Sequence, residues 1–101
     1  MNGGSIGLKI RLRLLGMLRF LSLFKDQEET YVDYIGGTVE DLVKHIASKV
    51  ESKEKPLLLN DHGEISPELL IFLNDKPVLG PNRFSQPLSE GDLVELALDS
   101  G

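Results

Sequence analysis

Hydrophobic and polar side chains alternate strictly over residues 8–14. The apolar members are Leu8, Ile10, Leu12 and Leu14, and the basic residues between them are Lys9, Arg11 and Arg13. A period of two is typical of a strand with one buried face, so this segment predicts a β-strand whose outer face is basic. Residues 17–24 have no clear period and indicate a short helix or turn packed on the core. Residues 30–35 are rich in β-branched and aromatic side chains and predict a second strand.

A helix is predicted after the glycine pair at 36–37. Thr38 is expected to be its N-cap, with Glu40 and Asp41 in the first turn, where carboxylates suit the positive end of the helix dipole. Apolar residues then recur at helical spacing: Val39, Leu42, Val43, Ile46, Ala47 and Val50. This stripe predicts one amphipathic helix over 39–51 that packs on the core.

The second half of the chain predicts further strands. A buried strand is expected at 69–73, and the Asn74-Asp75 turn leads into a short strand at 76–79, whose proline indicates a sheet edge. The last strand is expected at 93–98. Because the first and last strands are strongly apolar, both are expected to lie centrally in the sheet. The order of elements predicts an α+β domain of two layers, one sheet backed by one long helix.

The chain has 101 residues and no cysteine. Its length fits one domain over 1–101, with 1–7 expected to be flexible and 99–101 to form a C-terminal tail. The absence of cysteine excludes disulfides, thiolate metal sites and a cysteine nucleophile. The start of the chain lacks the features of a secretion signal, and the longest nearly apolar stretch, 14–24, is too short to span a bilayer. A soluble, cytoplasmic protein with no membrane partner is therefore expected.

The formal net charge of −5 is unevenly distributed. Residues 1–25 contain five basic side chains and no acid, whereas the rest of the chain holds six basic and all sixteen acidic side chains. The basic segment is either balanced by neighbouring carboxylates, or it forms a basic face of Lys9, Arg11 and Arg13 that orients the protein on a partner. An acidic chain is a poor general binder of nucleic acid, because phosphate contacts supply most of that affinity. RNA binding through the basic face remains a weaker alternative.

No pattern in the sequence predicts catalysis by the chain on its own. The two histidines, His45 and His62, are expected on the solvated side of a helix and in a loop, so they do not predict a metal site. No serine stands in a glycine-x-serine-x-glycine setting, and no glycine-rich phosphate loop occurs. We therefore expect a protein that is not an enzyme and has no cofactor.

Several segments together resemble the MoaD and ThiS family of small sulfur-carrier proteins. Residues 8–12 are similar to the opening strand of that family, and residues 37–42 to its entry into the helix. Residues 70–78 resemble its strand, turn and short strand, and residues 87–96 resemble its last turn and strand. The resemblance spans roughly residues 8–98. It implies the ubiquitin-like β-grasp fold, a mixed four- to five-stranded sheet packed on one main helix.

The resemblance implies that the functional group is the C-terminal carboxylate of Gly101. An ATP-dependent adenylating enzyme of the ubiquitin-activating type would convert it to an acyl-adenylate, and sulfur transfer would then give a thiocarboxylate. The sulfur would serve molybdopterin, thiamin or tRNA-thiolation pathways, with a molybdopterin synthase large subunit or a thiazole synthase as a further partner. Some members of the family are instead conjugated to lysines of other proteins. The carrier would be a protein co-substrate and not an enzyme.

The tail and one sheet face are the candidate partner-binding sites. The tail comprises Asp99, Ser100 and Gly101 and extends about 10 Å at most. The family usually ends in Gly-Gly on a longer tail. Leu93 and Ala97 are expected to point away from the helix, on the same face as Lys9, Arg11 and Arg13. The alternative function is a non-catalytic β-grasp interaction domain with a chemically silent C-terminus, which the serine at 100 and the short tail favour.

Overall fold

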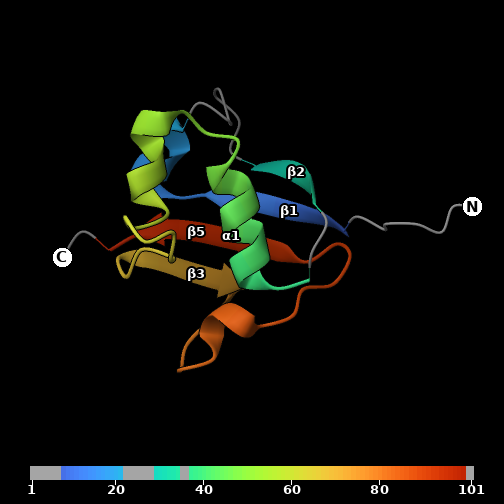
Figure 1. The fold of residues 1–101 in the computed structure, drawn as a ribbon. Coiled ribbons are helices and arrows are strands. Elements are labelled where there is room, and N and C mark those ends of the chain that lie inside the picture. The colour runs from blue at the N-terminus through green and yellow to red at the C-terminus, as the bar shows by residue number, and fades with distance from the viewer. Residues whose placement is uncertain (1–7, 22–28, 35–36, 100–101) are drawn as a thin grey trace, which may run out of the picture.

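The computed structural model describes residues 8–21, 29–34 and 37–99. One mixed five-stranded sheet has the order β2-β1-β5-β3-β4, and the helix α1 (Val39–Ala47) lies across one face of it (Figure 1). The strands are β1 (Leu8–Leu14), β2 (Glu29–Tyr34), β3 (Leu69–Leu73), β4 (Lys76–Pro77) and β5 (Leu93–Leu98). The predicted α+β architecture is confirmed as a β-grasp fold, with β1 and β5 in the interior of the sheet.

The first and last strands lie side by side although they are far apart in the sequence. β1 and β5 are parallel, with Arg11 opposite Leu93 and Arg13 opposite Glu95. The other neighbours, β1 with β2, β3 with β5 and β3 with β4, are antiparallel. A parallel pair needs a long connection between its strands. In this chain that connection holds β2, α1, β3 and β4.

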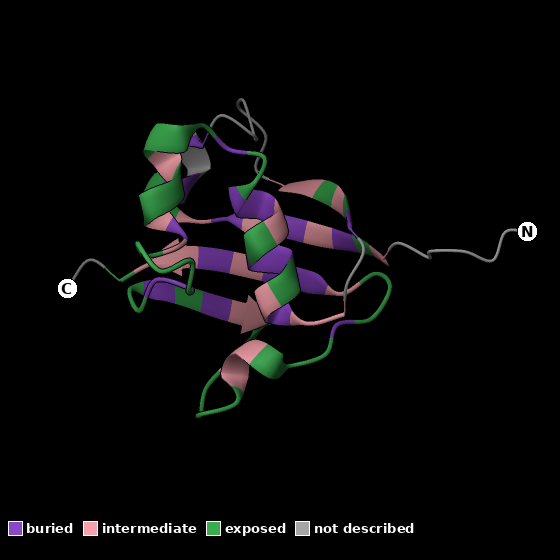
Figure 2. Ribbon diagram, in the orientation of Figure 1, coloured by how far each residue is buried: buried purple, intermediate pink, exposed green. Residues whose placement is uncertain are grey.

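The hydrophobic core lies between the sheet and α1. The inward residues of β1 and β5 and the apolar stripe of α1 are buried, as Figure 2 shows by colour. The large side chains that are fully buried are Ile10, Leu12, Leu14, Leu18, Leu42, Ile46, Leu58, Leu96, Val39, Val43 and Val94. Each such side chain contributes about 1.5–3 kcal/mol of hydrophobic free energy when it leaves water. The alternation in the sequence therefore identified the buried face of β1 correctly.

The N-terminus of α1 is capped as the sequence predicts. The Thr38 hydroxyl accepts a hydrogen bond from the Asp41 N–H at 3.2 Å, and the Asp41 carboxylate accepts from the N–H groups of Gly37 and Thr38 at 3.1 and 3.3 Å. The bond from Gly37, followed by those of Thr38, holds the pKa of the Asp41 carboxyl below its ordinary value. This reciprocal arrangement is a capping box, and it satisfies N–H groups that no helical carbonyl reaches.

The C-terminus of α1 differs from the prediction, because the helix ends at Ala47 and not at residue 51. The Ser48 N–H is shared between the carbonyls of Lys44 and His45 at 3.1 Å each, and the Ser48 hydroxyl donates to the His45 carbonyl at 2.6 Å. Serine competes in this way for backbone groups and favours helix ends. Val50 still packs on the core with 7% of its surface exposed. The apolar stripe therefore continues beyond the last helical turn.

Other boundaries also differ from the sequence prediction. A 3-10 helix, η2 (Ser52–Leu57), was not predicted, and β4 is two residues long where four were expected. The short helix expected at 17–24 is the 3-10 helix η1 (Gly16–Phe20), whereas residues 22–24 lie outside the described part of the chain. A third 3-10 helix, η3 (Arg83–Ser85), follows β4. Residues 1–7 and 100–101, predicted to be a flexible start and part of the tail, are likewise not described.

Candidate functional site

The sheet face that turns away from α1 carries the predicted partner-binding residues. The strand register brings together on this outer face Lys9, Arg11, Arg13, Glu29, Tyr31, Asp33, Leu70, Phe72, Leu93, Glu95 and Ala97. Residues that oppose each other across two strands project to the same side of a sheet, so the five predicted members share one surface. The sequence prediction of a common face for β1 and β5 is therefore correct.

The outer face is not basic around the two arginines. Arg13 contacts the Glu95 carboxylate at 3.1 Å and the Glu29 carboxylate at 3.5 Å, and Arg11 lies 3.9 Å from Glu29. Burial lowers the pKa of Arg13, but the hydrogen bonds and charges of Glu29 and Glu95 outweigh it and raise that pKa above its ordinary value. Of the two interpretations of the basic segment, charge balance by neighbouring carboxylates describes Arg11 and Arg13.

Lys9 is the exposed basic position on β1. It opposes Asp33 in the register with β2, and its backbone N–H donates to the Glu90 carboxylate at 2.9 Å. The Gly91 N–H in turn donates to the Lys9 carbonyl at 2.9 Å. The turn before β5 is therefore fastened to the start of β1, and it fixes where Leu93 enters the sheet.

The apolar surface of the outer face lies over β3 more than over β5. Leu93 has only 7% of its surface exposed and Ala97 is half-buried, whereas Leu70 is 41% exposed. Tyr31 on β2 is 62% exposed. Leu70 and Tyr31 were not singled out from the sequence. All five residues of segment 69–73 are apolar, which predicts a strand buried on both faces. Nothing in the sequence therefore indicated that the face carrying Leu70 is exposed to water.

The C-terminal tail is attached to the sheet for one residue beyond β5. The Asp99 N–H donates to the Glu68 carbonyl at 2.8 Å, which continues the hydrogen bonds between β3 and β5. Gly101, whose carboxylate is the group predicted to be activated, and its neighbour Ser100 lie outside the described residues. Of the three tail residues counted from the sequence, Asp99 is therefore held to β3.

The two histidines lie in a helix and in a loop, as predicted, but His45 is half-buried and not on the solvated side of α1. His45 on α1 faces Tyr34 with ring centroids 6.0 Å apart, and His62 lies in the exposed turn before Gly63. Burial, followed by the charge of Lys49, lowers the pKa of His45, and burial with the charges of Asp41 and Asp92 raises the pKa of Tyr34 to about 12. In the described part of the chain, no three histidine or acidic side chains are grouped as metal ligands would be. No helix there has the length and apolar character needed to cross a membrane.

Comparison with known proteins gives structural but not sequence matches. No protein family profile matches the chain, and no curated protein sequence matches it. Among solved structures, it is similar to small archaeal modifier protein 1 from Methanosarcina acetivorans, with 15% identity, a TM-score of 0.75, and coverage of 94% of this chain and 97% of that one. It is also similar to Urm1 from Trypanosoma brucei, with 20% identity, a TM-score of 0.70, and coverage of 97% and 95%.

A third match is a chain of the BexX/CysO complex from Amycolatopsis orientalis, with 15% identity and a TM-score of 0.62. It covers 91% of this chain and 97% of that one. At such identities the likeness concerns the fold. These structural neighbours are small ubiquitin-like proteins of the MoaD and ThiS type, and this chain has their β-grasp fold.

Proposed function

We propose that this protein is a ubiquitin-like carrier or modifier whose C-terminal glycine, Gly101, is activated by an ATP-dependent adenylating enzyme. The observation that supports this most is the structural match over more than 90% of the chain to a small archaeal modifier protein and to CysO, which was solved in a complex. The resemblance of residues 8–98 to sulfur carriers points the same way.

The chemistry would take place entirely at the terminal carboxylate. A carboxylate oxygen of Gly101 attacks the α-phosphorus of ATP and displaces pyrophosphate, which gives an acyl-adenylate. Hydrosulfide then displaces AMP to form a thiocarboxylate, or a lysine amine displaces AMP to form an amide. Glycine suits this role because it has no Cβ to obstruct the carbonyl carbon and adopts backbone angles that other residues avoid. ATP and the catalytic groups would belong to the partner enzyme.

The outer face would position the tail in that enzyme. Leu70 opposes Ala97 across β3 and β5. Ala97 lies two residues before Asp99, whose N–H is still bonded to the residue before β3. Exposed apolar surface of this kind is typical of partner contacts. Lys9 and the paired Arg11 and Arg13 would lie at the rim, where charged groups set orientation and association rate more than affinity.

The alternative is a β-grasp interaction domain whose C-terminus takes no part in chemistry. The hydrogen bond between Asp99 and Glu68 favours it, because it holds Asp99, a residue of the predicted tail, to β3. The two functions share the outer face as a docking surface and differ only in what happens at Gly101.

Intact-mass measurement decides between them. The protein ending in Gly101 is incubated with ATP, a sulfide donor and the cognate activating enzyme, which is shown in parallel to act on another carrier. The carrier function predicts a mass increase equal to the difference between a sulfur and an oxygen atom, absent from a chain that lacks Gly101. A variant with Gly-Gly inserted between Asp99 and Ser100 serves as a control for reach. An increase in the extended variant alone supports the interaction domain, and no increase in either variant rejects the carrier function.

A further inference from the structure

Strand β3 has an open edge over Leu69–Ile71. The short strand β4 covers only Phe72 and Leu73, which pair with Pro77 and Lys76. The last contact is a hydrogen bond of 2.9 Å from the Val78 N–H to the Ile71 carbonyl. Within the described residues, the chain makes no further backbone hydrogen bond to this edge of β3 after Val78, and it turns at Gly80, whose φ of +98° only glycine adopts readily.

The backbone groups at this edge point away from β5. Asn74 and Asp99 donate to the Leu93 and Glu68 carbonyls across β3 and β5, so even-numbered residues of β3 bond to β5 and odd-numbered residues face the edge. Among the described residues, the Ile71 N–H and the Leu69 carbonyl have no backbone partner on that side. They are one donor and one acceptor, spaced as a further strand would require.

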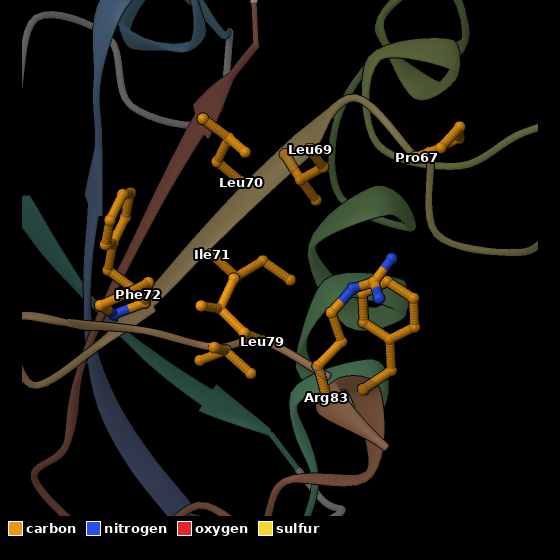
Figure 3. Close-up of a pocket in the computed structure, with 10 residues that line it drawn as sticks. Pro67, Leu69, Leu70, Ile71, Phe72, Leu79 and Arg83 are labelled. Atoms are coloured by element: carbon orange, nitrogen blue, oxygen red, sulfur yellow. The ribbon is translucent and has the colours of Figure 1, made fainter. Parts of the chain in front are cut away.

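A groove of about 190 Å³ runs along the same edge. Its walls include Pro67, Leu69, Ile71, Leu79, Arg83 and Phe84. Figure 3 shows Leu69, Ile71, Leu79 and Arg83 on one side of β3, with Leu70 and Phe72 on the other. Leu79 is 77% exposed, so its apolar surface is open to a ligand. A water molecule occupies about 30 Å³ in the liquid, so the groove has the volume of about six water molecules. This is enough for one or two aliphatic side chains.

One cation marks the end of this groove. The Arg83 guanidinium carbon lies 4.5 Å from the centre of the Phe84 ring, and Nη1 donates to the Gly80 carbonyl at 3.2 Å. The remaining N–H groups of Arg83 have no carboxylate partner among the described residues, and no acidic side chain lines the groove. A guanidinium held in this way favours a carboxylate that approaches along the edge.

We infer that the open edge of β3 binds an extended peptide of a partner protein by strand addition, with aliphatic side chains in the groove and a carboxylate beside Arg83. Main-chain hydrogen bonds to Ile71 and Leu69 supply part of the affinity, and the groove selects alternate side chains. This site borders the outer face at Leu70 and Phe72, which also line the groove, and it does not depend on activation of Gly101.

The test uses the full chain and a synthetic probe, acetyl-Ser-Val-Ile-Val-Glu-Glu-Ser-amide, followed by amide NMR. At about 1 mM peptide, within the weak range of peptide recognition, we expect shift changes at residues 67–72 and 78–84. The Ile71 amide should also exchange with solvent about tenfold more slowly. Two N-methylated peptides, each blocked at alternate residues, are the backbone controls. Only alternate N–H groups of an added strand point toward β3. Strand addition therefore requires that one methylated peptide no longer binds the protein and that the other binds as before.

Side-chain variants test the chemistry of the occupant. Arg83→Gln should weaken the peptide about three- to fivefold, and a glutamine version of the peptide should bind both proteins equally weakly. Leu79→Ser should weaken binding without altering the fold, since this side chain is mostly in water. Lys55→Gln is the matched control, because it removes the same charge from an exposed position in η2. Shifts confined to the outer face, equal loss with both methylated peptides, or equal effects of Arg83→Gln and Lys55→Gln would each overturn the proposal.

Discussion

Nη1 of Arg13 lies 3.1 Å from Oε2 of Glu95, across the parallel strands β1 and β5. Glu29 approaches the same arginine from β2, so a row of alternating charges crosses three strands. The positive charges of Arg11 and Arg13 are therefore matched locally by Glu29 and Glu95. Any docking partner would meet a mixed surface here and not a basic one.

Charge reversal at Arg13 tests this arrangement. Arg13→Glu places a third carboxylate beside Glu95 and Glu29, and we expect the melting temperature to fall by about 5 °C. The exchanged pair Arg13→Glu with Glu95→Arg should recover most of the loss, and thermal unfolding followed by circular dichroism measures both. An unchanged melting temperature for the single variant would show that the contacts contribute nothing to stability.

The core between the sheet and α1 predicts a large contrast between two leucines. Leu42→Ala removes a fully buried side chain and should lower the free energy of unfolding by about 3 kcal/mol, because the cavity cannot collapse completely. Leu79→Ala changes a side chain that is 77% exposed and should cost less than about 0.5 kcal/mol. Urea unfolding at neutral pH gives both values. Similar losses for the two variants would contradict the placement of α1.

The cap of α1 makes stability depend on acidity. The pKa of Asp41 in the folded protein lies below its ordinary value of 3.8. The contribution of the Asp41 carboxylate to the free energy of unfolding is therefore fully present above pH 3.8. The contribution is lost as the pH falls through the lower, folded value. Asp41→Asn should therefore flatten the stability profile below about pH 4. Urea midpoints at a series of pH values, compared with those of the parent protein, would refute this if the two curves stayed parallel.

Loss of the Thr38 hydroxyl should destabilise the same helix end. We expect Thr38→Ala to lower the free energy of unfolding by about 1 kcal/mol, since the Asp41 N–H loses its acceptor. Thr38→Ser keeps an acceptor and should remain close to the parent protein. Equal destabilisation of the two variants would assign the effect to the methyl group and not to the cap.

The outer face predicts a kinetic effect that is separate from stability. Leu70→Ser should slow activation of Gly101 by the adenylating enzyme about tenfold, as expected for an apolar contact at an interface. It should change the unfolding free energy little, because Leu70 is 41% exposed. Met17→Ser is the matched control, an exposed apolar side chain in η1 and not on this face. Equal rates for the two variants would argue against docking through β3 and β5.

Local patterns were enough to predict the strands, the helix start and their order along the chain. Alternation fixed the buried face of β1, and Thr38 with Asp41 fixed the cap, because these features depend on residues a few positions apart. The pattern failed at the end of α1. There Val50 keeps the apolar stripe while the Ser48 N–H is shared between two carbonyls. Periodicity reports which side chains face the core and not which hydrogen bonds hold the backbone.

Tertiary structure decided what each surface offers. The pairing of Arg13 with Glu95, the exposure of Leu70, the open edge at Ile71 and the hydrogen bond that holds Asp99 to Glu68 all join residues from different strands. The sequence by itself determined the strands, the start of α1 and their order along the chain. Only the strand order and register determined which charges cancel and which apolar groups meet water, because these depend on neighbours that are distant along the chain.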